Sequence, residues 1–395
     1  MNIAFDAKRA FENSTGLGQY SRTLINSLCN YYPDNKYFLC TPGSGTAYNY
    51  KAFDNTFLLQ PHGLLNKLFK SVWRSNGIKK DLKKNGIDIY HGLSHEIPFG
   101  LEKTGIKSVV TIHDLIFEKY PDQYNRPDIL IYRKKFRNSC ANADKIIAIS
   151  HQTKTDLQEI YNVAENKIVV CYQSCDPAFS RRVSEEEKNR IRKLYRLPEK
   201  FFLSVGSIIE RKNLLLIAKA MKIIRDRLSS GEVLPVVVIG EGKNYKQTVK
   251  DFLKQHNLEE KMIFLNESEQ IRHLPSFHSS EDLPAIFQQA TALIYPSIEE
   301  GFGIPVLEAI SSKIPVITSD RSALPEAGGK AACYIDPLDP EETAEAMMAV
   351  AEDEILRMEM IGQSCRHLQN FTPEKTAAGV MAVYKSLNPN RYGNV

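Results

Sequence analysis

The feature that most constrains the fold is a repeated alternation of short apolar runs with longer helical stretches. Such alternation predicts parallel strands joined by crossover helices. The pattern restarts once, after a charged stretch at residues 176–200. We therefore predict an α/β chain of two doubly wound, Rossmann-like units. The predicted strands are residues 2–7, 37–41, 88–92, 107–114, 145–150 and 167–172 in the first unit, and 201–207, 235–240, 290–297, 315–320 and 331–336 in the second.

The length of 395 residues also favours two domains, because single hydrophobic cores stop growing below this size. We place the first domain at residues 1–175 and the second at 176–372. A final helix is predicted over residues 373–390. Thr372 suits the N-cap of that helix, Pro373 suits its first position, and Glu374 suits its first turn.

The composition, with 43% hydrophobic and 25% charged residues, is typical of a soluble globular protein. No stretch has the ~18 uncharged apolar residues of a membrane-spanning helix, and the first apolar run is too short for a signal-peptide core. The seven cysteines are scattered, and the nearest pair, Cys171 and Cys175, lacks zinc or redox spacing. These features predict a cytoplasmic protein with free thiols.

The net charge is +4, and its positive excess lies in the N-terminal half, notably in residues 64–84 and 126–138. A membrane-surface helix would explain the first segment. A helix whose apolar stripe faces the core and whose basic face is solvated would also explain it, and this is the commoner arrangement. Nucleic acid is not expected as a partner, because the basic residues are not interleaved with stacking aromatics. The apolar residues at helical spacing are Leu64, Leu65, Leu68, Phe69, Val72 and Trp73.

Ligands of open parallel sheets bind beyond the carboxyl ends of the strands, so the loops there are candidate sites. Gly16 and Gly18 follow the first strand and lead into a helix, where backbone N–H groups could approach an anion. His113 and Asp114 end the fourth strand and could bond sugar hydroxyls. An ordinary turn and a buried structural histidine are the competing explanations.

Two loops of the second unit carry stronger signals. Gly206, Arg211 and Lys212 surround a predicted helix start, an arrangement suited to a diphosphate, although a basic surface turn would look similar. The run from Glu299 to Glu308 places two glycines between acids. Its proline is expected to begin a helix with Glu308 in the first turn, and its two carboxylates could flank a sugar and accept hydroxyl protons.

The run Glu300-Gly-Phe-Gly-Ile-Pro-Val-Leu-Glu308 closely resembles the Glu-x7-Glu signature of the family 4 glycosyltransferases of GT-B architecture. Residues 280–297 and 315–337 resemble the sequences that flank it. The resemblance implies two Rossmann-like domains facing each other across a cleft, with the last helix crossing back to the first domain. It further implies that the first domain binds the acceptor and the second binds the sugar nucleotide. The implied reaction is retaining transfer that requires no metal or other cofactor.

The resemblance also assigns roles to single residues. The chain departs from the family pattern in two places: Ser207 stands where many relatives have arginine, and Gln173-Ser174-Cys175 replaces the usual Asn-Gly-Val. His113, Glu300 and Lys212 are the expected catalytic residues. The resemblance implies that Glu300 and the backbone of Gly301, Phe302 and Gly303 contact the donor sugar, and that Glu308 contacts the ribose. Arg211 and Lys212, beside Gly206, would contact the diphosphate, as would Gly16 and Gly18 from the other domain. His113 would contact the sugar near its anomeric carbon.

The segments HDLIFEKYPDQY and GSIIERKNL resemble mannosyltransferases that build bacterial surface polysaccharides. GDP-mannose is therefore the expected donor, ahead of UDP-sugars. The expected acceptor is a saccharide, free or lipid-linked, with peripheral contact at the inner face of the cell membrane. A sugar-nucleotide epimerase of the same architecture is one alternative. A phosphorylase of this architecture is another, but it would need a pyridoxal-phosphate lysine, for which the sequence shows no convincing site. A non-catalytic partner in a polysaccharide assembly complex is the third alternative.

Overall fold

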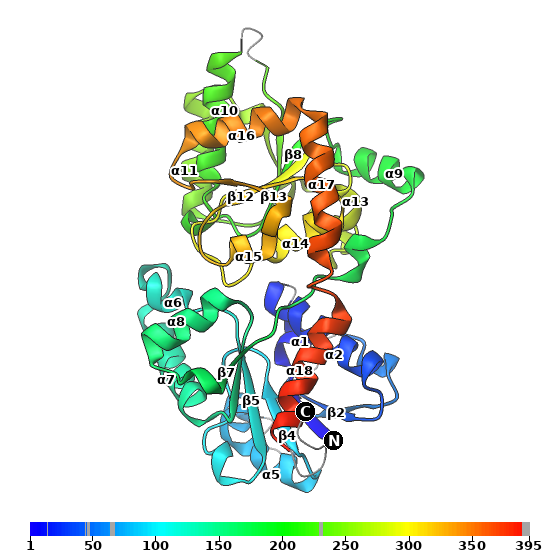
Figure 1. Ribbon diagram of the computed structural model, residues 1–395, viewed down its shortest axis with the longest axis vertical. Coiled ribbons are helices and arrows are strands. Elements are labelled where there is room, and N and C mark those ends of the chain that lie inside the picture. Colours follow the sequence, from blue (N-terminus) through cyan, green and yellow to red (C-terminus); the bar gives the residue numbers. More distant parts are fainter. Residues whose placement is uncertain (14, 44, 46–47, 64–67, 229–231, 389–395) are drawn as a thin grey trace. The chain divides into compact units, whose positions relative to one another are not determined.

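The computed structural model describes the chain except residues 14, 44, 46–47, 64–67, 229–231 and 389–395. The chain divides into two compact units (Figure 1). Residues 1–174 form the first unit together with the segment that starts at Phe371, and residues 175–370 form the second. The sequence analysis placed these limits at residues 175 and 372. Residues 389–390 of the predicted last helix lie outside the described residues.

The first unit is built on a parallel sheet of seven strands, in the order β3-β2-β1-β4-β5-β6-β7. The order reverses between β1 and β4, and crevices for ligands form at such a point. Alternate residues of one strand face opposite sides of the sheet. The strands are β1 (Asn2–Asp6), β2 (Lys36–Cys40), β3 (Thr56–Leu59), β4 (Ile89–Gly92), β5 (Lys107–Ile112), β6 (Lys145–Ala148) and β7 (Ile168–Val170).

The second unit contains a parallel sheet of six strands, in the order β10-β9-β8-β11-β12-β13. Its order reverses between β8 and β11, which pair directly through Leu203 and Leu293. The loops that follow β8 and β11 therefore start side by side. The strands are β8 (Phe202–Val205), β9 (Val236–Ile239), β10 (Met262–Phe264), β11 (Ala292–Tyr295), β12 (Val316–Ser319) and β13 (Ala332–Ile335).

The predicted fold class is confirmed, and each predicted strand has a counterpart in one of the two sheets. The sequence analysis missed two strands, β3 and β10. Both lie at an edge of their sheet. Both are short, with four residues in β3 and three in β10, and Phe57 of β3 is 40% exposed, so each gives only a short apolar signal.

Helices pack on the sheets and complete both units (Figure 1). In the first unit they are α1 (Lys8–Glu12), α2 (Gly16–Tyr31), α4 (Lys70–Val72), α5 (Ile78–Lys84), α6 (Ile116–Lys119), α7 (Arg126–Asn142), α8 (His151–Tyr161) and α18 (Pro373–Ser386). In the second they are α9 (Glu185–Tyr195), α10 (Leu214–Arg227), α11 (Asn244–Gln255), α12 (Pro275–His278), α13 (Leu283–Phe287), α14 (Ile304–Ser311), α15 (Leu324–Gly328), α16 (Pro340–Glu352) and α17 (Glu354–Leu368).

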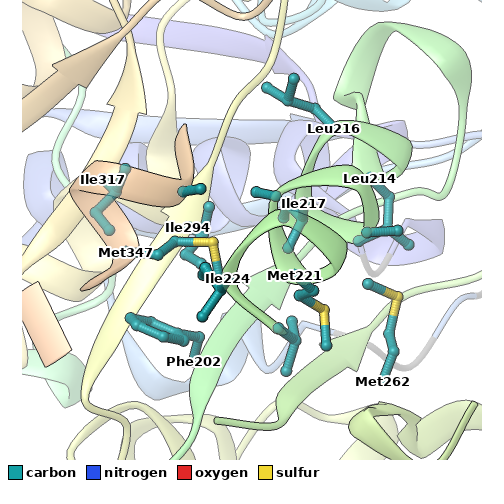
Figure 2. Close-up of a cluster of buried hydrophobic side chains, with 14 of the residues drawn as sticks. Phe202, Leu214, Leu216, Ile217, Met221, Ile224, Met262, Ile294, Ile317 and Met347 are labelled. Atoms are coloured by element: carbon teal, nitrogen blue, oxygen red, sulfur yellow. The ribbon is translucent and has the colours of Figure 1, made fainter. Parts of the chain in front are cut away.

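The first sheet has a hydrophobic core on each face. Ala4 of β1 belongs to one core, whereas its neighbours Ile3 and Phe5 belong to the other. In the second unit, α10 and α16 pack together over one face of the sheet. Figure 2 shows that core, in which Met221 of α10 and Met347 of α16 lie near strand residues such as Ile294.

The predicted C-terminal helix is present as α18 and packs against α2 of the first unit. Thr372 is its N-cap, with Oγ1 accepting from the backbone N–H of Lys375 at 3.2 Å. Met381 and Tyr384 of α18 are buried in the core that contains the apolar side of α2. The chain therefore returns to its first unit after it has completed the second.

The basic segment at residues 64–84 differs from the favoured expectation. Trp73 is buried, and its Nε1 donates to Asp81 at 2.7 Å, but Leu68, Phe69 and Val72 are 73%, 60% and 58% exposed. A core-facing stripe is therefore wrong for these three residues. Leu64 and Leu65 lie outside the described residues. No helix among the described residues is long and apolar enough to cross a membrane.

Candidate active site

The loop between β11 and α14 brings Glu300 to the carboxyl end of the second sheet. Gly303 is the N-cap of α14 and has a φ of 115°, and a Cβ at this position would lie 2.7 Å from Cδ2 of Leu324. Both the backbone conformation and the space therefore require glycine here. Phe302 is buried and anchors the loop, while Gly301 before it is half-buried.

The start of α14 differs from the prediction. The helix begins at Ile304, with Pro305 second, so Glu308 lies beyond the first turn. Proline is tolerated at the second position because first-turn N–H groups have no acceptor within the helix. The expected placement of Glu308 in the first turn is wrong, and the helix dipole does not account for an acid at this position.

Glu300 is a buried carboxylate that holds two cations. Its side chain is 10% exposed, and Oε1 lies 3.1 Å from Nη1 of Arg211 and forms a shorter ion pair with Nζ of Lys212. Burial raises the pKa of Glu300, but the charges of Lys212 and Arg211 outweigh burial and hold that pKa below its ordinary value. Glu300 is therefore ionised at neutral pH, and its carboxylate is shared by two cations.

Arg211 and Lys212 reach Glu300 from a short 3-10 helix, η7 (Glu210–Lys212), which follows β8. The backbone carbonyl of Arg211 accepts from the N–H of Ile298 at 2.9 Å, so η7 is bonded to the loop after β11. Gly206 at the end of β8 has a φ of 133°, and a Cβ there would lie 3.7 Å from Cε of Lys212. Glycine at this position is therefore required chiefly by its backbone conformation.

Glu308 lies in a different environment from Glu300. Among the described residues, the Glu308 side chain forms no hydrogen bond or ion pair. Sγ of Cys175, the residue before Asp176, lies 3.2 Å from Oγ of Ser311, one turn further along α14. Burial, and next the charge of Asp176, raise the pKa of Glu308 to about 8. Of the two acids in the predicted pair, Glu300 is charged at neutral pH and Glu308 is mostly protonated.

Sequence analysis missed three residues that shape this site. Tyr295 ends β11 and bonds Glu300 at 3.1 Å. Ser322, after β12, accepts from the backbone N–H of Glu300 at 3.2 Å and donates to its carbonyl at 2.6 Å. Gly240 directly follows β9, and a Cβ there would lie 1.8 Å from the carbonyl oxygen of Gly206. Only the position of Tyr295 and Gly240 at strand ends could have signalled them.

His113 lies at the carboxyl end of β5 in the first unit and is buried. Its Nε2 lies 2.8 Å from the Leu93 carbonyl, which can only accept, so Nε2 carries the proton and Nδ1 does not. Burial, and next the charge of His95, lower the pKa of His113 to about 3. The imidazole is therefore neutral at neutral pH. Asp114 beside it accepts from the N–H of Ile116 at 3.1 Å.

Gly16 and Gly18 lie in the first turn of α2, and the short helix α1 separates them from β1. A Cβ at Gly18 would lie 1.9 Å from the carbonyl oxygen of Asn13, whereas nothing lies within 4 Å of one at Gly16. Close packing therefore explains Gly18. Tyr20, on the same helix, approaches His113 edge-on at 4.6 Å between ring centroids, so α2 and His113 belong to one site region.

Comparison with known families bears on the whole chain. Residues 185–366 match the family described as Glycosyl transferases group 1, and residues 16–179 match Glycosyltransferase Family 4. The two matches together cover most of the sequence. The chain belongs to the family 4 glycosyltransferases. The glycosyltransferase thus has the enzyme class that its Glu300 to Glu308 signature predicts, and this favours glycosyl transfer over the epimerase and binding-partner alternatives.

Two curated relatives are similar to the glycosyltransferase over most of its length. It is 25% identical to O-antigen chain mannosyltransferase B of Escherichia coli, over 76% of this chain and 74% of that protein. It is 27% identical to O-antigen chain mannosyltransferase RfbU of Salmonella typhimurium, over 65% of this chain and 63% of that protein, which is less than two thirds of the relative.

Solved structures resemble the glycosyltransferase over almost its full length. A glycosyltransferase from Rickettsia africae has a TM-score of 0.72 at 18% identity, with 98% of this chain and 99% of that chain covered. WaaG, a glycosyltransferase involved in lipopolysaccharide biosynthesis, has a TM-score of 0.66 at 16% identity, with both chains fully covered. At these identities the likeness establishes the GT-B fold.

Proposed function

We propose that the carboxyl end of the second sheet is the sugar-nucleotide site of a retaining hexosyltransferase. The observation that carries the proposal is the buried meeting of Glu300 with Lys212 and Arg211, at two adjacent strand ends and beside glycine loops. Two cations that share one carboxylate suit a diphosphate, and rigid donors suit a leaving group that gains charge as its bond to the sugar breaks.

In this proposal each group of the second unit has one task. Arg211 and Lys212, beside Gly206, bind the donor diphosphate and take up its charge without requiring a metal. Glu300 and the backbone of residues 301–303 hold the donor sugar. Glu308 binds the ribose, where a carboxyl group with a pKa near neutrality can donate to or accept from a hydroxyl.

Binding requires an exchange of partners at Glu300. In the structure, the carboxylate pairs with both cations. When the diphosphate takes over Lys212 and Arg211, the carboxylate oxygens become available to accept hydrogen bonds from sugar hydroxyls. The same ion pair thus keeps a buried acid satisfied in the free enzyme and prepares two cations for the leaving group.

The first unit is proposed to supply the remaining contacts. His113 has an unprotonated Nδ1 and a fixed ring, because Nε2 donates to the Leu93 carbonyl. We assign Nδ1 to a hydroxyl of the donor sugar near its anomeric carbon. The N-terminus of α2, with Gly16 and Gly18, is assigned to the diphosphate, since helix N-termini favour anions. A neutral histidine excludes a role as general acid at neutral pH.

The proposed donor is GDP-mannose, and the proposed product is a mannosylated saccharide of a surface polysaccharide. Both curated relatives described above have mannosyltransferase names, and the segments that contain His113 and Lys212 resemble such enzymes. Titrating the pure protein with GDP-mannose, UDP-glucose, UDP-N-acetylglucosamine and UDP-galactose tests this choice. Tightest binding of GDP-mannose is expected, and tightest binding of any UDP-sugar refutes it.

The proposed acceptor is a lipid-linked saccharide, reached by peripheral contact with the inner face of the cell membrane. Apolar side chains are exposed on two basic segments, with Leu68 at 73%, Phe69 at 60% and Leu130 at 68%. Glu96 links the segments, because it pairs with Arg74 at 2.5 Å and with Lys135 at 2.7 Å. Exposed apolar groups among cations suit an anionic lipid surface.

Co-sedimentation with phosphatidylglycerol vesicles at low salt tests this contact. The double variant Leu68→Ser with Phe69→Ser is expected to lower the membrane partition coefficient by about 1000-fold, since each buried side chain contributes ~2 kcal/mol and ~1.4 kcal/mol is a factor of ten. Ile355→Ser with Met358→Ser is the matched control, because these residues of the second unit are 72% and 67% exposed. Absence of binding by the unsubstituted protein refutes the membrane contact.

A further inference from the structure

Tyr295 contacts both members of the central ion pair. It is the last residue of β11 and is 3% exposed. Its hydroxyl oxygen lies 3.1 Å from Oε1 of Glu300 and accepts a shorter hydrogen bond from Nζ of Lys212. The same ammonium lies 4.6 Å from the centre of the phenol ring.

The chemistry of the three groups fixes the direction of both hydrogen bonds. An ammonium can only donate and a carboxylate can only accept, so Lys212 donates to Tyr295 and Tyr295 donates to Glu300. Burial, and next the negative charge of Glu300, raise the pKa of Tyr295 far above its ordinary value, so the phenol keeps its proton. The hydroxyl oxygen of Tyr295 therefore accepts from Lys212, while its proton is donated to Glu300.

The backbone of Tyr295 is held on a central strand. It pairs with Thr318 of β12, whose Oγ1 also donates to the Tyr295 carbonyl at 2.8 Å. β11 lies between β8 and β12, so neither of its sides is an edge. A ring carried on such a strand is a fixed platform for flexible side chains.

We propose that Tyr295 is a positioning residue that holds Lys212 and Glu300 in place while a nucleoside diphosphate replaces Glu300 on the ammonium. The inference rests on the proposed donor site. When Lys212 turns to the diphosphate, the hydroxyl still donates to Glu300, so the buried carboxylate keeps a partner. The hydroxyl oxygen meanwhile remains available to accept from the ammonium, so Lys212 keeps its place.

The test compares nucleotides that differ by one phosphate. Dissociation constants for GDP, GMP, UDP and UMP are measured by calorimetry on the full chain and on Tyr295→Phe, Tyr295→Leu and Tyr195→Phe. Tyr195 is a matched control because it is buried and its hydroxyl donates to a carboxylate of the same unit, Asp282, at 2.7 Å. The readout is the affinity ratio of each diphosphate to its monophosphate.

Loss of the hydroxyl is expected to lower this ratio about 10-fold in Tyr295→Phe, because hydrogen bonds to charged groups are the strong ones. Loss of the ring as well is expected to lower it further in Tyr295→Leu. Monophosphate affinity and the Tyr195→Phe ratio are expected to match the unsubstituted protein.

Two outcomes overturn the role of Tyr295. One is an unchanged ratio in Tyr295→Phe, and the other is an equal loss of monophosphate and diphosphate affinity, which would indicate general damage to the site. A different outcome identifies failure of the donor site itself. If the unsubstituted protein shows no preference for GDP or UDP over GMP or UMP, the diphosphate site is refuted before any variant is compared.

Discussion

The hydroxyl of Tyr384 lies 2.6 Å from Nδ1 of His91, although the two residues are 293 positions apart. His91 belongs to β4, and its Nε2 lies 2.8 Å from Oγ1 of Thr111 on β5. All three side chains are buried. The last helix of the chain is therefore bonded to the centre of the first sheet as well as packed against α2.

Tyr384→Phe is expected to destabilise the first unit by about 1–2 kcal/mol, because it leaves a buried histidine nitrogen without its hydroxyl partner. Urea unfolding followed by circular dichroism measures the change. Tyr31→Phe is the control, since Tyr31 is 47% exposed on α2. Equal midpoints for the two variants would show that the Tyr384 hydrogen bond adds no stability.

Lys212→Ala is expected to lower kcat/KM for the donor by about 100-fold or more, as loss of a charged group at a developing negative charge costs about 3 kcal/mol. Steady-state assays with the best donor of the panel measure it. Lys222→Ala is the control, because Lys222 lies on the surface of α10 and pairs with Asp226. A Lys212→Ala enzyme with wild-type kcat/KM would remove this lysine from the proposed mechanism.

Glu308→Gln is expected to raise the melting temperature more at pH 9 than at pH 5. The folded pKa of Glu308 is about 8, above its ordinary value of 4.5, so the folded protein keeps a proton that the unfolded chain has lost. The free energy of unfolding therefore declines as the pH rises from about 4.5 and has lost this contribution above about 8. Glutamine cannot ionise and avoids the loss.

Calorimetry at several pH values measures this difference, and Glu352→Gln, at an exposed position of the second unit, is its control. A difference between Glu308→Gln and the unsubstituted protein that stays constant from pH 5 to pH 9 would contradict a buried, titrating carboxyl at this position.

Gly18→Ala and Gly16→Ala form a pair on one helix turn that separates packing from ligand binding. Gly18→Ala is expected to destabilise by about 1–3 kcal/mol, because its Cβ would meet the Asn13 carbonyl at 1.9 Å. Gly16→Ala has free space and is expected to fold normally, while donor affinity falls if its backbone approaches the diphosphate. Melting curves and donor titration separate the two effects, and normal donor affinity in Gly16→Ala would remove Gly16 from the site.

The central strands could be predicted from sequence because they are buried on both faces and read as continuous apolar runs. The edge strands β3 and β10 were missed because they are only four and three residues long and give a short apolar signal. The predicted start of α14 was one residue too late, because proline fits either of the first two helix positions. The left-handed backbone of Gly303 decides between them.

The α/β class and the two units follow from strand periodicity, and loop glycines and acid spacing single out Lys212, Glu300 and Glu308, because these are local properties of the sequence. How these residues interact depends on contacts between segments that are far apart in the chain. The order β8-β11 brings Lys212 to Glu300 across 88 positions and places the Tyr295 hydroxyl against both of them. It also gives the two acids different protonation, because ionisation depends on burial and on neighbouring charges that come from distant parts of the chain.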